Sequence, residues 1–112
     1  MQKFEYRTPR YPVDLPVVFT LHDSSIHGRC KEIGKEGMRV QLQHPVPPDT
    51  CGTVSIAYKD VSLELRVCVA HAAAGYDGLK FLFESEKDRN AVERLVALLS
   101  GPSGPPGPVL VR

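Results

Sequence analysis

The clearest strand in the sequence is Val61-Ser62-Leu63-Glu64-Leu65-Arg66-Val67-Cys68-Val69, in which apolar and polar side chains alternate without interruption. Successive side chains of a β-strand point to opposite faces, so this period of two predicts a strand with one face in a core and the other in water. The same alternation recurs between residues 13 and 83. It predicts five further strands, at residues 13–21, 29–33, 38–42, 53–58 and 79–83.

Turn signals separate these strands. Lys59-Asp60 predicts a tight reversal, and residues 34–37, bounded by Gly34 and Gly37, predict a turn. Residues 44–49 contain three prolines, which remove backbone donors and exclude a strand or helix interior. Residues 72–77, rich in alanine and glycine, are predicted to form a loop. Six short strands with turns at these intervals predict a small antiparallel barrel.

One amphipathic helix is predicted at residues 86–99. Ser85 and Asp88 have the spacing of a helix-capping box, with aspartate in place of the usual glutamate. The apolar positions that follow recur at helical spacing and are Val92, Leu95, Val96 and Leu99. We expect this stripe to pack on the barrel; the alternative is a partner-binding groove. The fold class is therefore all-β with one C-terminal helix.

Three segments are predicted along the 112 residues. Residues 1–12 form an N-terminal arm, and residues 13–99 form the barrel with its closing helix. Residues 100–112 are rich in proline and glycine, which predicts a disordered tail. The length suits a single domain that buries a core without metal or disulfide staples.

The charge of the chain is nearly balanced, because 14 Lys+Arg oppose 13 Asp+Glu for a net charge of +1. Strong electrostatic attraction to nucleic acid or to a membrane is therefore not expected. No apolar run approaches the roughly 18 residues that span a bilayer. The first five residues lack the apolar segment of a secretion signal, so we expect a cytoplasmic protein.

The cysteines and histidines predict no metal site. Three cysteines, Cys30, Cys51 and Cys68, are widely spaced and odd in number, so neither a disulfide framework nor a metal knuckle is expected. Cys68 falls in a strand, where we expect a free thiol that behaves as a small apolar side chain. The histidines lack ligand spacing on a shared element; they are His22, His27, His44 and His71.

Two motifs bear on function. The first is a basic arm that leads into a strand, Tyr6-Arg7-Thr8-Pro9-Arg10-Tyr11-Pro12-Val13-Asp14-Leu15-Pro16. The second is a glycine turn between two strands, Lys31-Glu32-Ile33-Gly34-Lys35-Glu36-Gly37-Met38-Arg39-Val40. In this order and at about this distance, they resemble the PilZ domain, the bacterial receptor module for cyclic di-GMP. The resemblance covers residues 5–99 and implies a PilZ-like six-stranded antiparallel β-barrel.

The resemblance also implies a ligand site, whose signature in the family is R-x-x-x-R in the arm and D/N-x-S-x-x-G in the turn. Arginine suits a cyclic dinucleotide because its planar fork bonds phosphate oxygens and guanine edges. Arg10 matches the last arginine of the arm, and Arg7 matches an extra arginine often found beside the first. Tyr6 stands where the first arginine belongs.

The turn departs from the signature as well. Glu32 stands in place of aspartate or asparagine, and Gly34 replaces the serine, while Gly37 is retained. The missing arginine and hydroxyl bonds together correspond to about 2–4.5 kcal/mol, or roughly 30- to 1000-fold in affinity. The candidate site is therefore degenerate.

We accordingly predict a non-enzymatic signalling adaptor of bacterial motility, polarity or surface-organelle control, which acts by protein contacts and binds cyclic di-GMP weakly or not at all. The alternative is a genuine cyclic di-GMP receptor that uses Arg7, Arg10, Glu32 and Gly37. A nucleic-acid-binding barrel is disfavoured by the balanced charge and the 7% aromatic content. No nucleophile–base pair or phosphate loop suggests an enzyme, and no cofactor is expected. The arm and the tail are the candidate partner surfaces, and the arm is favoured because arginine and tyrosine anchor interfaces well.

Overall fold

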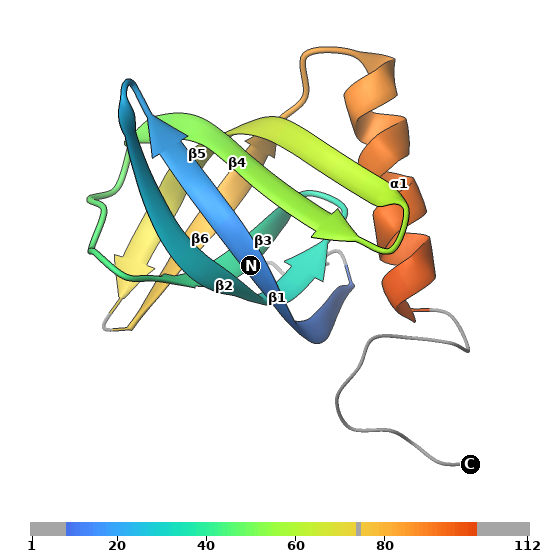
Figure 1. Cartoon of the computed structure of the whole chain (residues 1–112), viewed down its shortest axis with the longest axis horizontal. Coiled ribbons are helices and arrows are strands. Elements are labelled where there is room, and N and C mark those ends of the chain that lie inside the picture. The colour runs from blue at the N-terminus through green and yellow to red at the C-terminus, as the bar shows by residue number, and fades with distance from the viewer. Residues whose placement is uncertain (1–8, 74, 101–112) are drawn as a thin grey trace, which may run out of the picture.

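A computed structural model of the protein describes residues 9–73 and 75–100. Six antiparallel strands form a closed barrel, and one helix packs on its outside (Figure 1). The elements in chain order are β1 (Arg10–Leu21), β2 (Ser24–Gly34), β3 (Gly37–Leu42), β4 (Cys51–Tyr58), β5 (Val61–Ala73), β6 (Tyr76–Leu82) and α1 (Glu86–Ser100). The predicted fold class is confirmed.

The barrel closes because β1 pairs on both sides. The strand order is β1-β2-β3-β6-β5-β4, and β4 returns to pair with β1 from Val17↔Ile56 to Thr20↔Thr53. The connection from β3 passes over two strands, so that β6 lies between β3 and β5. This order brings residues 37–40 beside residues 77–80, which are far apart in the sequence. Closure leaves no sheet edge among the six strands.

Two of the predicted boundaries are wrong. Residues 72–77 were expected to be a loop, but β5 extends to Ala73 and β6 begins at Tyr76, so the two strands pair almost to their tips. The second strand was expected from residue 29, whereas β2 begins at Ser24 and pairs with β1 along its whole length. In both cases, backbone hydrogen bonds to the neighbouring strand keep residues of low β-propensity in the strand conformation.

The core follows the predicted alternation. Inward residues of every strand are buried, and the largest strand residues with almost no exposed surface are Phe19, Ile33 and Met38. The helix buries the whole predicted stripe of Val92, Leu95, Val96 and Leu99 against β5 and β1.

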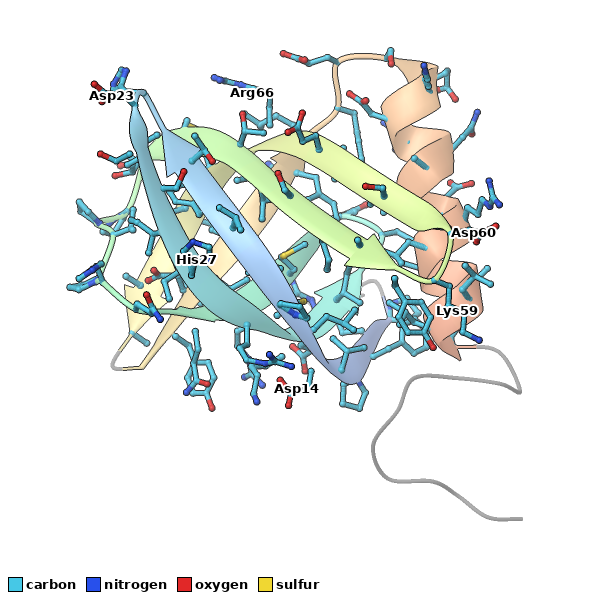
Figure 2. The ribbon with its side chains drawn as sticks, in the orientation of Figure 1. Asp14, Asp23, His27, Lys59, Asp60 and Arg66 are labelled. Carbon is cyan, nitrogen blue, oxygen red and sulfur yellow. A yellow bond between two sulfur atoms is a disulfide. The ribbon has the colours of Figure 1, made fainter. Side chains whose placement is uncertain are left out.

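Polar contacts fix the helix at its start and along its outer side. The Asp88 N–H donates to Oγ of Ser85 at 3.3 Å, as a capping residue requires. An ion pair of 3.5 Å joins Arg94 to Asp60 in the β4–β5 turn, which lies beside α1 (Figure 2). The helix is thus held against the barrel by packing first and by exposed charges second.

A disulfide joins Cys51 and Cys68, so the expectation of a free thiol at Cys68 is wrong. These residues lie directly opposite each other on β4 and β5, with Cα atoms 4.0 Å apart. Their separation of 17 residues gives no hint of this pairing; only the register of the two strands does. Cys30 is a free thiol, and burial raises its pKa to about 12, which keeps it protonated.

The single helix of the described residues is too short and too polar to cross a membrane.

Candidate functional site

The arm enters the barrel at Arg10. This residue is the first of β1, and its Cα lies opposite that of Gly34, so the arm continues directly into the β1–β2 ladder. The strand bulges between Pro12 and Leu15, which marks the change from arm to barrel wall. Tyr6 and Arg7, the other arm residues of the predicted site, lie outside the described residues.

Glu32 lies between two arginines. Its Oε1 is 3.7 Å from Nη1 of Arg10, and its Oε2 is 3.9 Å from Nη2 of Arg39. Register explains this arrangement, because Glu32 is opposite Pro12 on one neighbouring strand and opposite Arg39 on the other. Both distances exceed that of a hydrogen bond, so the carboxylate neutralises the arginines without fixing their orientation.

The two glycines of the turn are required by close backbone approach. A Cβ atom on Gly34 would lie 2.7 Å from the carbonyl oxygen of Pro9, too close for a real contact. A Cβ atom on Gly37 would collide with the carbonyl oxygen of Leu79 on β6. The space beside each glycine is therefore filled by the protein's own backbone.

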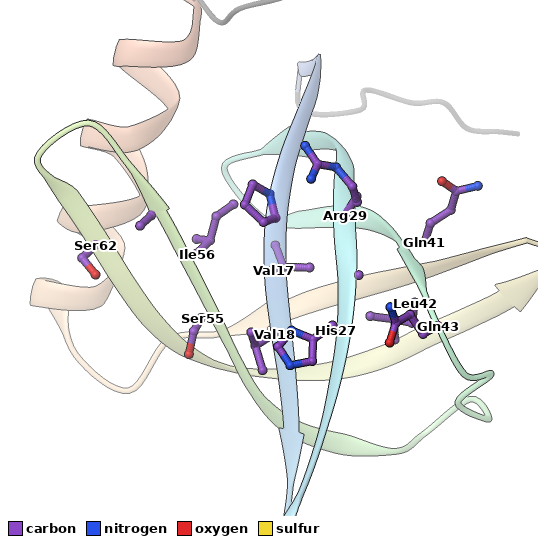
Figure 3. Close-up of a pocket in the computed structure, with 13 residues that line it drawn as sticks. Val17, Val18, His27, Arg29, Gln41, Leu42, Gln43, Ser55, Ile56 and Ser62 are labelled. Atoms are coloured by element: carbon purple, nitrogen blue, oxygen red, sulfur yellow. The ribbon is translucent and has the colours of Figure 1, made fainter.

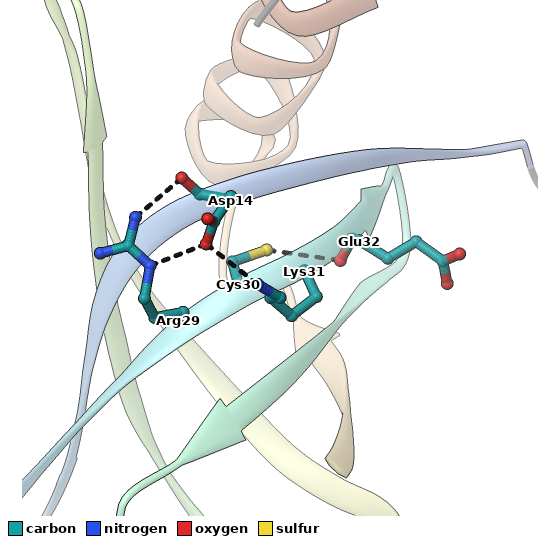
Figure 4. A network of polar contacts seen from close by, with 5 residues as sticks. All are labelled: Asp14, Arg29, Cys30, Lys31 and Glu32. Atoms are coloured by element: carbon teal, nitrogen blue, oxygen red, sulfur yellow. Dashed lines mark hydrogen bonds and ion pairs between the residues drawn. The ribbon is translucent and has the colours of Figure 1, made fainter. Parts of the chain in front are cut away.

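A second charged cluster adjoins this site on β1 and β2 (Figure 4). Nε of Arg29 donates to Oδ1 of Asp14 at 2.7 Å, and Nζ of Lys31 donates to the same oxygen at 3.2 Å. These hydrogen bonds hold the pKa of Asp14 below its usual value. Sequence analysis missed this cluster, and the only signal for it was the outward phase of the three residues on adjacent strands.

Arg39 and Tyr76 form a further contact that sequence analysis missed. The Arg39 guanidinium lies over the Tyr76 ring, 4.9 Å from its centroid, in cation–π geometry. Nε of Arg39 is buried and has no hydrogen-bond partner among the described residues. Tyr76 belongs to β6, which becomes a neighbour of β3 only through the order of strands in the barrel.

Comparison with known proteins identifies the family. The family model described as "PilZ domain" matches residues 5–98, which is most of the chain. The chain belongs to the PilZ domain family. PilZ domains are cyclic di-GMP receptor and signalling modules, which bind that ligand and protein partners. The predicted membership is therefore confirmed.

A solved structure supports the PilZ fold. The crystal structure of the PilZ domain of CeSA from a cellulose-synthesizing bacterium superposes with a TM-score of 0.70 at 19% sequence identity. The match covers 80% of this chain and 95% of that chain. None of the curated proteins compared with this PilZ domain matches it.

Two surface hollows lined by described residues of this PilZ domain are relevant here. A shallow groove of about 590 Å³ crosses the outer faces of the strands, with Arg29 and Gln41 on one side of β1 and Ser55 and Ser62 on the other (Figure 3). Arg29 is already committed to Asp14 there. Within residues 9–73 and 75–100, no cluster of three or more histidine, cysteine or acidic side chains could hold a metal ion.

The second hollow, of about 320 Å³, lies at one end of the barrel, and the buried residue Asp77 is part of its lining. The backbone N–H of Val46 donates to this carboxylate, which ties the proline-rich segment 44–49 to the barrel. Burial raises the pKa of Asp77, against the opposing effects of the Val46 bond and of His71. The barrel therefore disfavours the charged form of Asp77 relative to the unfolded chain.

We expect the Asp77→Asn variant to be at least as stable as the wild type at pH 7. Asparagine keeps an oxygen for the Val46 N–H and removes the buried charge. Because the folded-state pKa is raised, the wild type gains stability as the pH falls through that pKa towards 3.8, where the unfolded state also protonates. The advantage of the variant should thus shrink between pH 7 and pH 4, as measured by urea unfolding.

The Asp14→Asn variant is the control, because the pKa of Asp14 is shifted in the opposite direction. Wild-type protein should be more stable than Asp14→Asn above pH 3.8, and this difference in stability should be lost as the pH falls below that value. A greater stability of wild-type protein over Asp77→Asn that persists at pH 7 would contradict the assignment.

Proposed function

We propose that this PilZ domain is a cytoplasmic, non-catalytic signalling adaptor in bacteria, in which cyclic di-GMP binding is weak or lost. It acts through contacts with a protein of motility, polarity or surface-organelle control. The three proposed segments are the arm of residues 1–12, the barrel and helix of residues 13–99, and the tail of residues 100–112.

The observation that carries this proposal is the position of Glu32 between Arg10 and Arg39. In the family signature, the corresponding aspartate or asparagine serves the ligand. Here the longer carboxylate reaches both arginines, so a phosphate would compete with an internal anion for them. A dianionic ligand would also be repelled by Glu32 itself.

Gly34 supports the same conclusion. The signature has a serine there, but the Pro9 carbonyl oxygen occupies the space that a Cβ atom needs. The arm and the turn are thus packed against each other directly. The hydroxyl bond is absent, and the site has no room in which to regain it without moving β1.

We expect wild-type protein to show no saturable binding of cyclic di-GMP near micromolar ligand in a calorimetric titration. The Glu32→Asn variant should bind about tenfold more tightly than the wild type, because it frees Arg10 and Arg39 for phosphate and restores a residue of the signature. The measurement is isothermal titration of the full chain in both forms.

The matched control is Glu36→Gln, which removes one negative charge from the same turn at a residue outside the two ion pairs of Glu32. It should leave the affinity unchanged. Saturable submicromolar binding by wild-type protein would sink the proposal and favour the receptor hypothesis. Loss of such binding in the Arg10→Ala variant would then place the ligand in the signature site.

A further inference from the structure

Tyr76 stands out on the barrel surface. Among the described residues it is the one large hydrophobic side chain that is exposed, with 37% of its surface accessible. It projects from the first position of β6, beside the Arg39 guanidinium. Tyrosine and arginine are the residues most enriched at the energetic centres of protein interfaces.

Tyr76 is one of the residues that line the hollow at the barrel end. The apolar residues Leu42, Pro45 and Ala72 line it as well. The volume of about 320 Å³ is large enough for one aliphatic side chain. Asp77 also lines the hollow and would repel a second acidic group, while the apolar lining residues favour an apolar side chain.

The strands next to the hollow carry a net positive charge, which favours an acidic partner. The outer faces of β1, β2 and β3 carry more cations than anions, with Arg10, Arg29, Lys31 and Arg39 against Asp14 and Glu32. Arg39 is the cation next to Tyr76, and its buried Nε lacks a hydrogen-bond partner within the described residues. Within the described residues its ion pair is with Glu32, at 3.9 Å. The Arg39 side chain is 44% exposed, so a carboxylate from outside can reach the guanidinium and form a shorter ion pair than Glu32 does.

We propose that Arg39, Tyr76 and the hollow lined by Leu42, Pro45 and Ala72, together the Arg39–Tyr76 surface, bind an acidic segment of a partner protein. An apolar side chain of that segment enters the hollow, and a neighbouring carboxylate bonds Arg39. This inference rests on the proposed adaptor function and names the chemistry of the partner. Single-stranded nucleic acid fits less well, because Tyr76 offers one aromatic face and not a row of stacking platforms.

The test is a titration of ¹⁵N-labelled full-length protein, followed by NMR, with a synthetic five-residue probe that has one leucine flanked on each side by two glutamates. We expect saturable shifts of the amide signals of Arg39, Tyr76 and Gly78. A probe with glutamines in place of the glutamates, and one with serine in place of the leucine, should each bind about tenfold more weakly.

Two variants and one control locate the binding. Arg39→Gln and Tyr76→Ala should each weaken binding of the acidic probe by about tenfold or more. Arg66→Gln removes the same charge from β5, on the far side of the molecule from Asp14 (Figure 2), and should leave binding unchanged. Retained dispersion of the spectra verifies that each variant is folded.

Three outcomes would overturn the inference. They are the absence of saturable shifts, equal affinity for the acidic and glutamine probes, and a higher affinity for oligodeoxythymidylate that shifts the same amide signals. None of these bears on cyclic di-GMP, whose own titration decides the weak-binding part of the proposed function. The two proposals can therefore fail separately.

Discussion

Replacing Leu95 with alanine is expected to lower the free energy of unfolding by about 2–5 kcal/mol. Leu95 is completely buried, at the centre of the stripe by which α1 packs on the barrel. Alanine leaves a cavity there, because neither β5 nor the helix can move closer without breaking its other contacts. A domain of this size has only about 5–15 kcal/mol in total, so urea unfolding should show a large loss.

The matched control is Leu98→Ala on the same helix. Leu98 is only partly buried, and the same substitution should cost about 1 kcal/mol there. Both variants change the helix propensity by the same amount, so the difference between them measures packing on the barrel. Equal losses in the two variants would show that α1 does not depend on its buried face.

The strands with the clearest alternation of apolar and polar residues were predictable from the sequence. Strand segments that depend on hydrogen bonds to a neighbouring strand were not. Residues 61–69 differ sharply between their two faces, and that contrast identifies β5 without any neighbour. The start of β2, from Ser24 to Gly28, is polar and contains a glycine, so its strand conformation depends on pairing with β1. Pairing between distant segments leaves no local pattern in a sequence.

The candidate site divides in the same way. The order of the arm and the turn places Arg10, Glu32 and Gly34 together, and the barrel does bring these residues side by side. The contact between Arg39 and Tyr76 was not predicted, because it depends on β6 lying next to β3. The pairing of Cys51 with Cys68 likewise depends on the register of β4 against β5.

Reduction of the disulfide between Cys51 and Cys68 is expected to lower the free energy of unfolding by about 3 kcal/mol, the loop-entropy value for a closed loop of about 15 residues. The bond joins residues 17 apart that already face each other in the ladder. Most of its effect therefore falls on the unfolded chain, and the native barrel should keep its shape without it. Urea unfolding with and without reductant measures the loss.

The double variant Cys51→Ala, Cys68→Ala provides the control, since it should lose a similar free energy and become insensitive to reductant. Cys30 should stay unreactive towards thiol reagents in the native state, because burial keeps it protonated. An unchanged unfolding curve, with cleavage of the bond verified by mass spectrometry, would contradict the prediction.

In a reducing cytoplasm the two thiols would remain separate. Under the proposed location, the lower stability of the reduced form is then the one that matters, and the packing of α1 through Leu95 has to sustain the fold without the bond.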